Sequence, residues 1–205
     1  MTRIILIRHG QTAWNRVERF RGRADVPLND TGLAQAEATA RRVAAQWQPV
    51  AFYSSPLSRA VQTAEAMARR FDLPVQAHGG LIDIDYGQWQ GLTPDEARER
   101  WPERVDAWYR TPETAQIPGG ETLNDLRVRL IDAVRELAAR HRGETIVLVG
   151  HTVANRAILL EALGLDNSRF WRLGQDTCAI NVLTLDEADQ EFTLVSMNDT
   201  CHLRG

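Results

Sequence analysis

The chain has 205 residues, of which 43% are hydrophobic and 25% charged, as expected for a globular protein with one core. Its net charge of −3 argues against a general attraction to nucleic acid, and all 24 basic residues are arginine, which excludes lysine chemistry. We find no apolar stretch long enough for a membrane span and expect no signal peptide. Cys178 and Cys201 are too few for a disulfide framework, so we expect a reduced, cytoplasmic setting.

The first predicted strand, over 2–8, ends at three residues that can carry chemistry. An apolar run over 4–7 is followed by Arg8, His9 and Gly10. In open α/β sheets, ligands bind just beyond the carboxyl ends of strands. A guanidinium suits phosphate, and an imidazole can act as a nucleophile or an acid–base group near neutral pH. The junction therefore indicates an anion site, although side chains that merely face water would give the same pattern.

A short strand predicted over 51–54 leads into a helix predicted over 56–70. Ser55 and Pro56 indicate a hydroxyl N-cap followed by a proline at the first helical position. Arg59 would then lie about one turn into the helix, where the helix dipole favours anions. We expect an anion site there, with an ordinary surface arginine as the alternative.

The strand predicted over 144–150 repeats the pattern of the strand predicted over 2–8. Its apolar, β-branched run ends in a glycine that is followed by His151, and a helix is predicted over 152–163. Parallel neighbouring strands end at the same edge of a sheet, so His9 and His151 can meet across one crevice. Two imidazoles at one site suggest that one is neutral and attacks while the other is charged and stabilises.

The predicted elements alternate between strand and helix, which favours an α/β fold. Helices on both faces of a central sheet follow from right-handed crossovers. We expect a three-layer α/β/α sandwich with a mostly parallel, mixed central sheet, in a single domain over 1–205. The remaining predicted elements are a helix over 31–47, an irregular region over 72–120, a helix over 123–141 after an N-cap signature at Thr122 and Asp125, and a closing hairpin of strands over 178–186 and 191–197.

Residues 92–120 are predicted to be a lid-like insertion that faces the substrate. A short helix begins after Thr93, and Trp101, Trp108 and Tyr109 supply large apolar surfaces. As a lid, these rings would contact the leaving group and exclude water. The alternative is that they only hold the insertion on the core.

In combination, these stretches resemble the histidine phosphatase superfamily, also called phosphoglycerate mutase-like. The match extends from residue 3 to residue 203, and the order of its motifs is far more specific than a lone Arg-His-Gly. It implies a phosphoglycerate mutase-like fold and a reaction that needs no metal or other cofactor. The matching stretches are 8–15, 25–32 with Gln35 and Ala36, 54–60 with 62–64, 87–91, Gly150 with His151, and 198–200 with His202 and Leu203.

The resemblance also implies roles for individual side chains. His9 would take the phosphoryl group as a covalent intermediate, which splits one difficult transfer into two easier ones. Arg8, Arg59 and His151 would surround the phosphoryl oxygens and neutralise charge in the transition state. The further phosphate contacts that it implies are Asn15 as a neutral donor, the Arg21 side chain, the backbone N–H of Gly22, and Thr152.

The proton donor is where this chain departs from the family pattern. Relatives usually carry a glutamate shortly before a Gly-x-Trp-Glu-Gly stretch, whereas this chain has Asp83 before Gly-Gln-Trp-Gln-Gly. Asp83 is one methylene shorter, so the backbone must bring it nearer or it must act through a water. If the segment is extended, Asp85 projects to the same side, and two like charges would raise one pKa, which suits a general acid. We assign the role to Asp83, with Asp85 as its substitute and a structural acidic pair as the alternative.

The function expected from these residues is a metal-independent phosphatase that hydrolyses small organic phosphomonoesters through a phosphohistidine on His9. Mutase relatives generally carry a longer insertion between the proton donor and the second histidine, so we favour hydrolysis over phosphoglycerate mutase-type transfer. A non-catalytic phosphate-binding regulatory protein is the third possibility. We expect a small phosphorylated metabolite as the partner, with no nucleic acid and no membrane, and the sequence predicts no oligomeric state.

Overall fold

The computed structural model describes residues 1–15 and 19–204, and their strands form one six-stranded sheet. The order is β3-β2-β4-β1-β5-β6, in which β1, β4, β2 and β3 pair in parallel while β5 is antiparallel to both β1 and β6. The sheet is therefore mixed and mostly parallel, as predicted. The strands are β1 (Thr2–Arg8), β2 (Ala51–Ser54), β3 (Val75–Ala77), β4 (Thr145–Gly150), β5 (Ile180–Leu185) and β6 (Phe192–Asp199).

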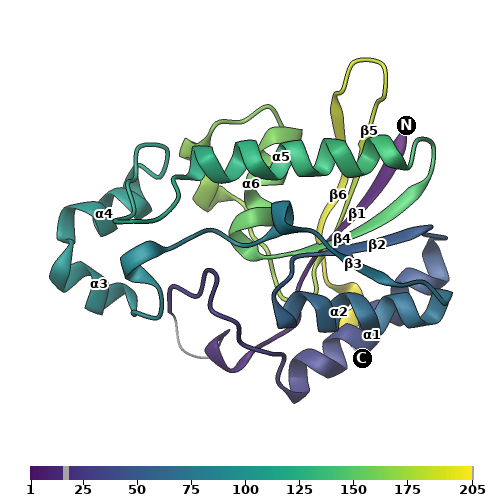
Figure 1. Cartoon of the computed structure of the whole chain (residues 1–205), viewed down its shortest axis with the longest axis horizontal. Coiled ribbons are helices and arrows are strands. Elements are labelled where there is room, and N and C mark those ends of the chain that lie inside the picture. The colour runs from purple at the N-terminus through teal and green to yellow at the C-terminus, as the bar shows by residue number, and fades with distance from the viewer. Residues whose placement is uncertain (16–18, 205) are drawn as a thin grey trace.

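Helices cover both faces of the sheet, which confirms the predicted three-layer sandwich. In Figure 1, α1 and α2 lie on one face, α5 and α6 lie on the other, and α3 and α4 extend beyond one end of the sheet. The helices are α1 (Asp30–Gln46), α2 (Ser58–Ala68), α3 (Pro94–Arg100), α4 (Pro102–Arg110), α5 (Leu123–Arg140) and α6 (Thr152–Ala162), and a 3-10 segment, η5 (Asn167–Arg172), follows α6.

Alternate residues of β1 pack into two different cores. Ile4 and Leu6 join the core under α5 and α6, whereas Ile5 and Ile7 join the core under α1 and α2. Burying such a side chain stabilises the fold by about 1.5–3 kcal/mol, so both faces of β1 favour one register. This two-sided burial explains the continuous apolar run in the sequence and fixes where Arg8 emerges at the end of the strand.

The start of α2 differs from the prediction over 56–70. The helix begins at Ser58, and the residue before it makes no side-chain cap. The carboxylate of Asp25 instead accepts from the Ser58 backbone N–H at 2.8 Å and from its hydroxyl at 2.7 Å. The predicted helix start after Ser55 is therefore wrong: the Ser55 hydroxyl accepts from the Leu57 N–H at 3.4 Å, but the helix begins at Ser58, whose N–H is satisfied by a carboxylate from a distant loop.

The region over 72–120 is more regular than predicted. It holds β3, which pairs with β2, and both α3 and α4. The expected helix after Thr93 is present with a complete capping box to Glu96, and the predicted cap of α5 at Thr122 and Asp125 is also confirmed. The sequence missed β3 because its three residues are too few to show a period.

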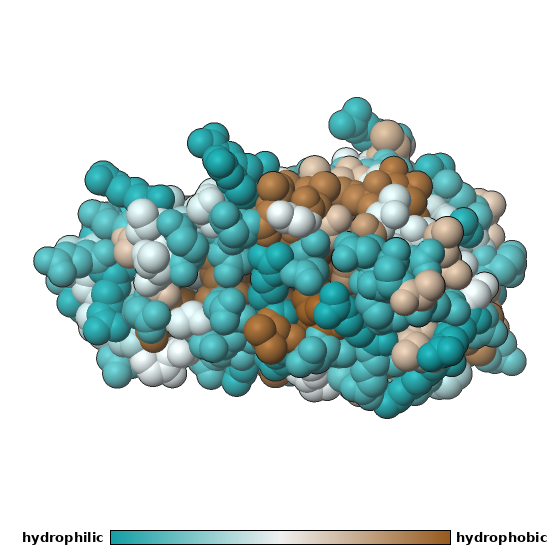
Figure 2. Space-filling model, turned by 90° about the horizontal axis from the view of Figure 1, so that it is seen from above, coloured by the Kyte–Doolittle hydropathy of each residue, from teal (hydrophilic) through white to brown (hydrophobic). Residues whose placement is uncertain are grey.

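The outer surface over α5 is mostly hydrophilic, with hydrophobic side chains in separate areas (Figure 2). Val128 on α5 is one of the exposed apolar residues. Among the residues placed in the structure, none of the helices is both long enough and apolar enough to cross a membrane.

Candidate active site

The carboxyl ends of β1 and β4 bring the two strand-end histidines together. Arg8 pairs in register with Gly150, and the His9 backbone N–H donates to the Gly150 carbonyl at 3.0 Å. The ring centroids of His9 and His151 are 5.2 Å apart, and both side chains are buried. Parallel pairing of two strands therefore builds the centre of the site from residues that are far apart in the sequence.

The hydrogen bonding of His9 identifies its reactive nitrogen. Its Nδ1 lies 2.7 Å from the Gly10 carbonyl oxygen, which can only accept, so Nδ1 carries the proton and Nε2 has a free lone pair. Burial and the positive charges of Arg59 and Arg8 lower the pKa of His9 well below its ordinary value of 6.5. His9 is therefore a neutral imidazole with a nucleophilic Nε2 at neutral pH.

His151 is held in the opposite tautomer. Its Nδ1 accepts from Arg59 Nε at 3.3 Å, so its proton is on Nε2, a buried atom without a hydrogen-bond partner among the described residues. Burial, followed by the positive charge of Arg59, lowers the pKa of His151 well below 6.5. The structure thus holds both imidazoles neutral, whereas the sequence suggested one charged ring.

Arg59 is buried behind the cavity wall rather than in the lining. Its side chain is 1% exposed and donates to the Ala24 carbonyl at 2.7 Å and to the Gly22 carbonyl at 2.8 Å. Its Nη2 also lies 3.7 Å from Asp83 Oδ2. Arg59 therefore shapes the 22–24 loop and supplies positive charge close to His151, while most of its donors already have protein acceptors.

Two further arginines at the site have donors without partners. Arg8 Nε and Arg21 Nη1 are buried and make no hydrogen bond within the described part of the chain, although another nitrogen of Arg8 donates to the Gln175 carbonyl. The chain turns at Gly22 with φ at +46°, and a Cβ there would lie 2.7 Å from the Ile84 carbonyl oxygen. Only glycine fits this turn without strain, which explains the position of Arg21 beside the site.

The two candidate acids have different environments. Asp83 is buried, and its Oδ2 lies 3.8 Å from His151 Nδ1, whereas the Asp85 carboxylate accepts from Arg23 Nη1 at 3.1 Å and from the Gly87 N–H at 2.8 Å. Burial raises the pKa of Asp83, and the Arg59 charge acts in the opposite direction. The expected rise in pKa is therefore present, but desolvation causes it rather than a paired carboxylate.

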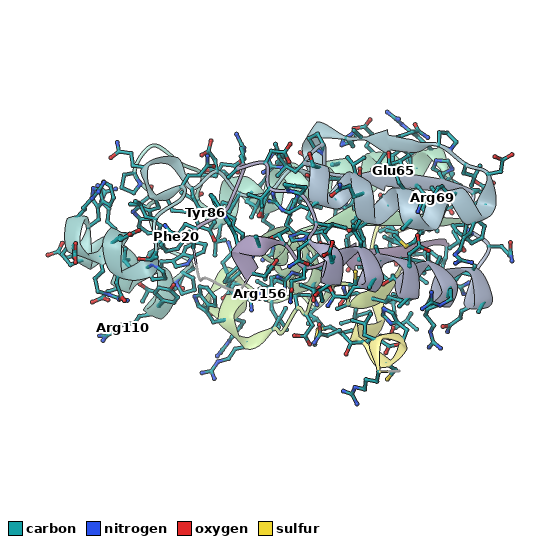
Figure 3. The ribbon with its side chains drawn as sticks, turned by 90° about the horizontal axis from the view of Figure 1, so that it is seen from below. Phe20, Glu65, Arg69, Tyr86, Arg110 and Arg156 are labelled. Atoms are coloured by element: carbon teal, nitrogen blue, oxygen red, sulfur yellow. The ribbon has the colours of Figure 1, made fainter. Side chains whose placement is uncertain are left out.

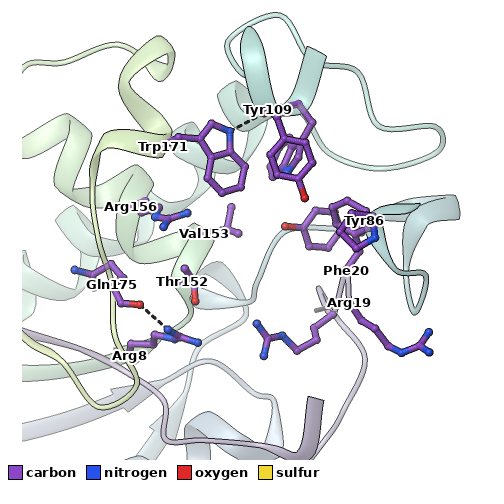
Figure 4. A pocket seen from close by; sticks show the side chains of 13 residues that line it. Arg8, Arg19, Phe20, Tyr86, Tyr109, Thr152, Val153, Arg156, Trp171 and Gln175 are labelled. Atoms are coloured by element: carbon purple, nitrogen blue, oxygen red, sulfur yellow. Dashed lines mark hydrogen bonds between the residues drawn. The ribbon is translucent and has the colours of Figure 1, made fainter. Parts of the chain in front are cut away.

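Two neighbouring cavities with shared lining residues open in front of these groups. A small one is lined by His9, Asp83 and Arg21, among others, and shares Thr152 and Val153 with a larger one of about 260 Å³. Figure 4 shows the larger cavity, with Arg8, Thr152 and Arg156 along one side and Tyr86 and Arg19 along the other. The structure therefore places the sequence-predicted Arg8, His9, Arg21, Gly22, Asp83 and Thr152 on the walls of these two neighbouring cavities.

His151, like Arg59, is absent from both linings, and so is Asn15. Its Oδ1 accepts from the Thr12 backbone N–H at 2.7 Å and from the Thr12 hydroxyl at 2.9 Å. Its side chain therefore stabilises the loop after β1, and neither cavity includes it in its lining.

The sequence analysis missed Phe20, Tyr86, Arg156 and Trp171 in the cavity lining, whereas it named Trp108 and Tyr109 as rings that would contact the leaving group. Phe20 and Tyr86 pack against each other between the α3–α4 pair and the sheet (Figure 3), and Trp108 packs against Tyr86. Trp171 donates from Nε1 to the Trp108 carbonyl at 2.7 Å. Only Arg156 had a usable signal, because it follows Thr152 by four residues on α6 and shares its helix face.

The comparisons with known proteins agree with this geometry. The family described as the histidine phosphatase superfamily (branch 1) matches residues 4–200. Phosphoserine phosphatase 1 of Hydrogenobacter thermophilus is 35% identical over 203 residues, which cover 99% of this chain and 95% of that protein. The metal-independent phosphoserine phosphatase of Arabidopsis thaliana is 35% identical over 205 residues, covering 99% and 84%.

A solved structure gives the same answer for the fold. YhfR of Bacillus stearothermophilus superposes with a TM-score of 0.93 at 28% identity, and the match covers 99% of this chain and 100% of that one. Together with the family match over nearly the whole length, this shows that the chain belongs to the histidine phosphatase superfamily, branch 1.

Proposed function

We propose that this protein is a metal-independent phosphatase that hydrolyses small organic phosphomonoesters through a phosphohistidine on His9. The observation that carries the proposal is the unprotonated Nε2 of a buried, neutral His9 beside a cavity shared with Asp83 and Arg21. Family membership supports it, and phosphoserine is the first substrate to test because two relatives are named for it.

In the first step, His9 Nε2 attacks phosphorus, and the bond from phosphorus to the ester oxygen breaks as the Nε2–P bond forms. The leaving alkoxide takes a proton from Asp83, whose raised pKa favours the protonated form that this step needs. The lowered pKa of His9 keeps the attacking nitrogen free of a proton.

In the second step, water attacks the phosphohistidine. Asp83, now a carboxylate, takes the proton from this water as the new P–O bond forms and the Nε2–P bond breaks. The products are inorganic phosphate and neutral His9, and Asp83 regains its proton, so the site returns to its starting state. One carboxyl group thus acts as acid and then as base.

The remaining groups stabilise charge on the phosphoryl oxygens. Arg8 Nε, Arg21 Nη1 and the Nε2–H of His151 are buried donors without partners in the described residues, and each is suited to an anionic oxygen. Thr152 is the first residue of α6, whose N-terminus adds a favourable dipole. Arg59 contributes its charge and holds the 22–24 loop in place.

The proposal extends to the organisation of the chain. Residues 1–205 form a single histidine phosphatase domain in which the insertion over 92–120 acts as a lid on the leaving-group side. Tyr109 and Trp108 support this role, because both line the larger cavity, although Trp108 also belongs to the core. A cytoplasmic location is part of the proposal and is supported by the two free cysteines.

Trapping of the intermediate tests the proposal. The purified protein is mixed with p-nitrophenyl phosphate or O-phosphoserine in excess chelator, quenched in alkali, and analysed for phosphohistidine by mass spectrometry. We expect phosphate release and an acid-labile phosphoryl group on His9, and a folded His9→Ala variant should show neither. Turnover by His9→Ala at the parent rate would overturn the proposal.

The same experiment separates the two alternative functions. A phosphoglycerate mutase would isomerise its substrate with a bisphosphate primer and release little phosphate. A phosphate-binding regulatory protein would bind phosphate but neither release it from esters nor form a phosphohistidine.

A further inference from the structure

Arg156 lies on the wall of the larger cavity and is fixed there by its packing. Its guanidinium carbon is 5.2 Å from the centroid of the Phe170 ring and 5.1 Å from that of the Trp171 ring. Its Nε donates to the Leu173 carbonyl at 2.7 Å. These contacts hold the plane of the guanidinium and direct one edge to the protein, so the terminal nitrogens are the donors available to a ligand.

The mechanism proposed above does not use this charge. Four arginines line the larger cavity within the described part of the chain, and one of them, Arg19, forms an ion pair with Glu96 at 3.5 Å. Arg8, Arg21 and Arg156 have no carboxylate within 4 Å in the described residues. The same described residues place no Asp or Glu in the lining of this cavity. Partly or fully buried cations without acidic partners are costly, and such sites are suited to anionic ligands.

The charges divide naturally between two parts of one substrate. A phosphate monoester carries a charge of about −1.5 to −2 at neutral pH, which Arg8 and Arg21 together balance. Arg156 is then left with one positive charge on the leaving-group side of the cavity, on the same face of α6 as Thr152 (Figure 4). A single negative charge on the leaving group would balance it.

We infer that Arg156 selects phosphomonoesters whose leaving group carries a carboxylate, which its terminal nitrogens bind while phosphate occupies the cavity beside His9. The inference rests on the proposed function, because it concerns the leaving-group side of the same site. Phe20, Tyr86 and Trp108 supply aromatic surface around the remainder of the leaving group.

The aromatic wall also offers an alternative preference. If ring stacking rather than the Arg156 charge determined specificity, phenyl phosphate would be the preferred substrate, and its turnover would not depend on a carboxylate. The two possibilities are distinguished by substrates that differ in the carboxylate alone.

The test compares O-phosphoserine with phosphoethanolamine, which has the same amine and ester but no carboxylate, and with phenyl phosphate. We expect the parent protein to prefer phosphoserine, measured as kcat/KM for phosphate release. In Arg156→Met, the ratio of phosphoserine to phosphoethanolamine should fall by about 10- to 100-fold, the range for losing a hydrogen bond to a charged group. Most of this loss should be in KM, because the carboxylate is bound in the ground state.

Two further variants control for packing and for total charge. Arg156→Lys keeps a positive charge without the planar fork and should recover part of the ratio, while thermal unfolding of each variant reports damage to the fold. Arg110, exposed at the end of α4 and outside the cavity lining (Figure 3), gives the matched control Arg110→Gln, which should leave the ratio unchanged.

The outcomes distinguish failure of the Arg156 inference from failure of the proposed phosphatase function. Equal kcat/KM for phosphoserine and phosphoethanolamine in the parent protein, a lower KM for phenyl phosphate than for phosphoserine, or an equal loss on all substrates in Arg156→Met would overturn the inference and leave the phosphatase intact. Failure to release phosphate from any of the esters would overturn the proposed function itself, and the inference with it.

Discussion

Replacing Asp83 with Asn should make turnover depend on how good the leaving group is. The substitution preserves the shape of the side chain, and an amide oxygen can still accept from the Ile84 N–H, which donates to Asp83 Oδ1 at 3.0 Å. The change therefore removes a proton donor while the local backbone keeps its hydrogen bond. An alkyl phosphate needs that proton when its ester bond breaks, whereas a nitrophenolate leaves without it.

General acid–base catalysis typically contributes about 10²- to 10⁴-fold, so hydrolysis of phosphoserine by Asp83→Asn should fall by this factor, or about 3–5 kcal/mol in barrier. The formation of phosphohistidine from p-nitrophenyl phosphate should fall by less than about tenfold, because no proton is needed in that step. Hydrolysis of the phosphohistidine still needs a base, so the variant should accumulate this intermediate. Rapid-quench measurements of the burst and of the steady state distinguish the two steps.

Asp85→Asn is the matched control, and it also tests the other candidate acid. The Asp85 side chain is 34% exposed and pairs with Arg23, so the substitution removes a partly exposed ion pair worth about 1 kcal/mol or less. Turnover of both substrates should stay within a few-fold of the parent value. If instead Asp85→Asn showed the leaving-group dependence, or Asp83→Asn slowed both esters equally without accumulating phosphohistidine, the assignment of Asp83 would be wrong.

Three more predictions concern pH, backbone strain and metals. His151 has a lowered pKa in the folded protein, so below pH 6.5 the unfolded chain binds more protons and the free energy of unfolding falls as the pH falls. His151→Gln should remove about 1 kcal/mol of the loss in unfolding free energy between pH 7.5 and 5.5. An unchanged pH dependence of stability in this variant would contradict the prediction. Gly22→Ala should lower both stability and kcat, because the added Cβ would meet the Ile84 carbonyl oxygen. Gly143→Ala, at φ +77° with open space around it, should lower the free energy of unfolding by only about 1–2 kcal/mol and leave activity unchanged. Equal losses of activity in the two variants would refute the role of the Gly22 contact. Treatment with a chelator followed by dialysis should leave phosphate release unchanged. A loss of activity that added Mg²⁺ or Zn²⁺ restores would contradict a metal-independent reaction.

The fold was predictable where a segment is buried on both faces. The strands that became β1 and β4 have continuous apolar runs because Ile5 and Val147 pack on one side of the sheet and Leu6 and Leu148 on the other. The start of α2 was not predictable, because its donors are satisfied by Asp25, which is 33 residues away in the sequence from Ser58. Local capping rules apply only when the partner is local.

In the candidate site, too, residues at strand ends were predictable from the sequence and other features were not. Arg8, His9 and His151 follow directly from the strand pattern, because parallel pairing brings both strand ends to one edge. The states of the histidines did not follow, since burial and neighbouring guanidinium groups determine their protonation. Arg156 and Trp171 were missed because side chains from η5, α4 and α6 meet there only in the folded chain.

The backbone that carries Asp83 bears on its proposed use in place of a longer glutamate. Arg129 on α5 donates from Nη1 to the Gly80 carbonyl at 2.9 Å and to the Ile82 carbonyl at 3.0 Å, and its Nη2 lies 3.0 Å from Glu121 Oε2. These bonds hold the segment before Asp83 to α5, where no regular strand would hold it. Because the backbone itself is fixed close to His151, the shorter side chain reaches the cavity without an extra methylene. The reach of a catalytic acid is therefore set by two parts of the chain, and the sequence shows only the length of the side chain.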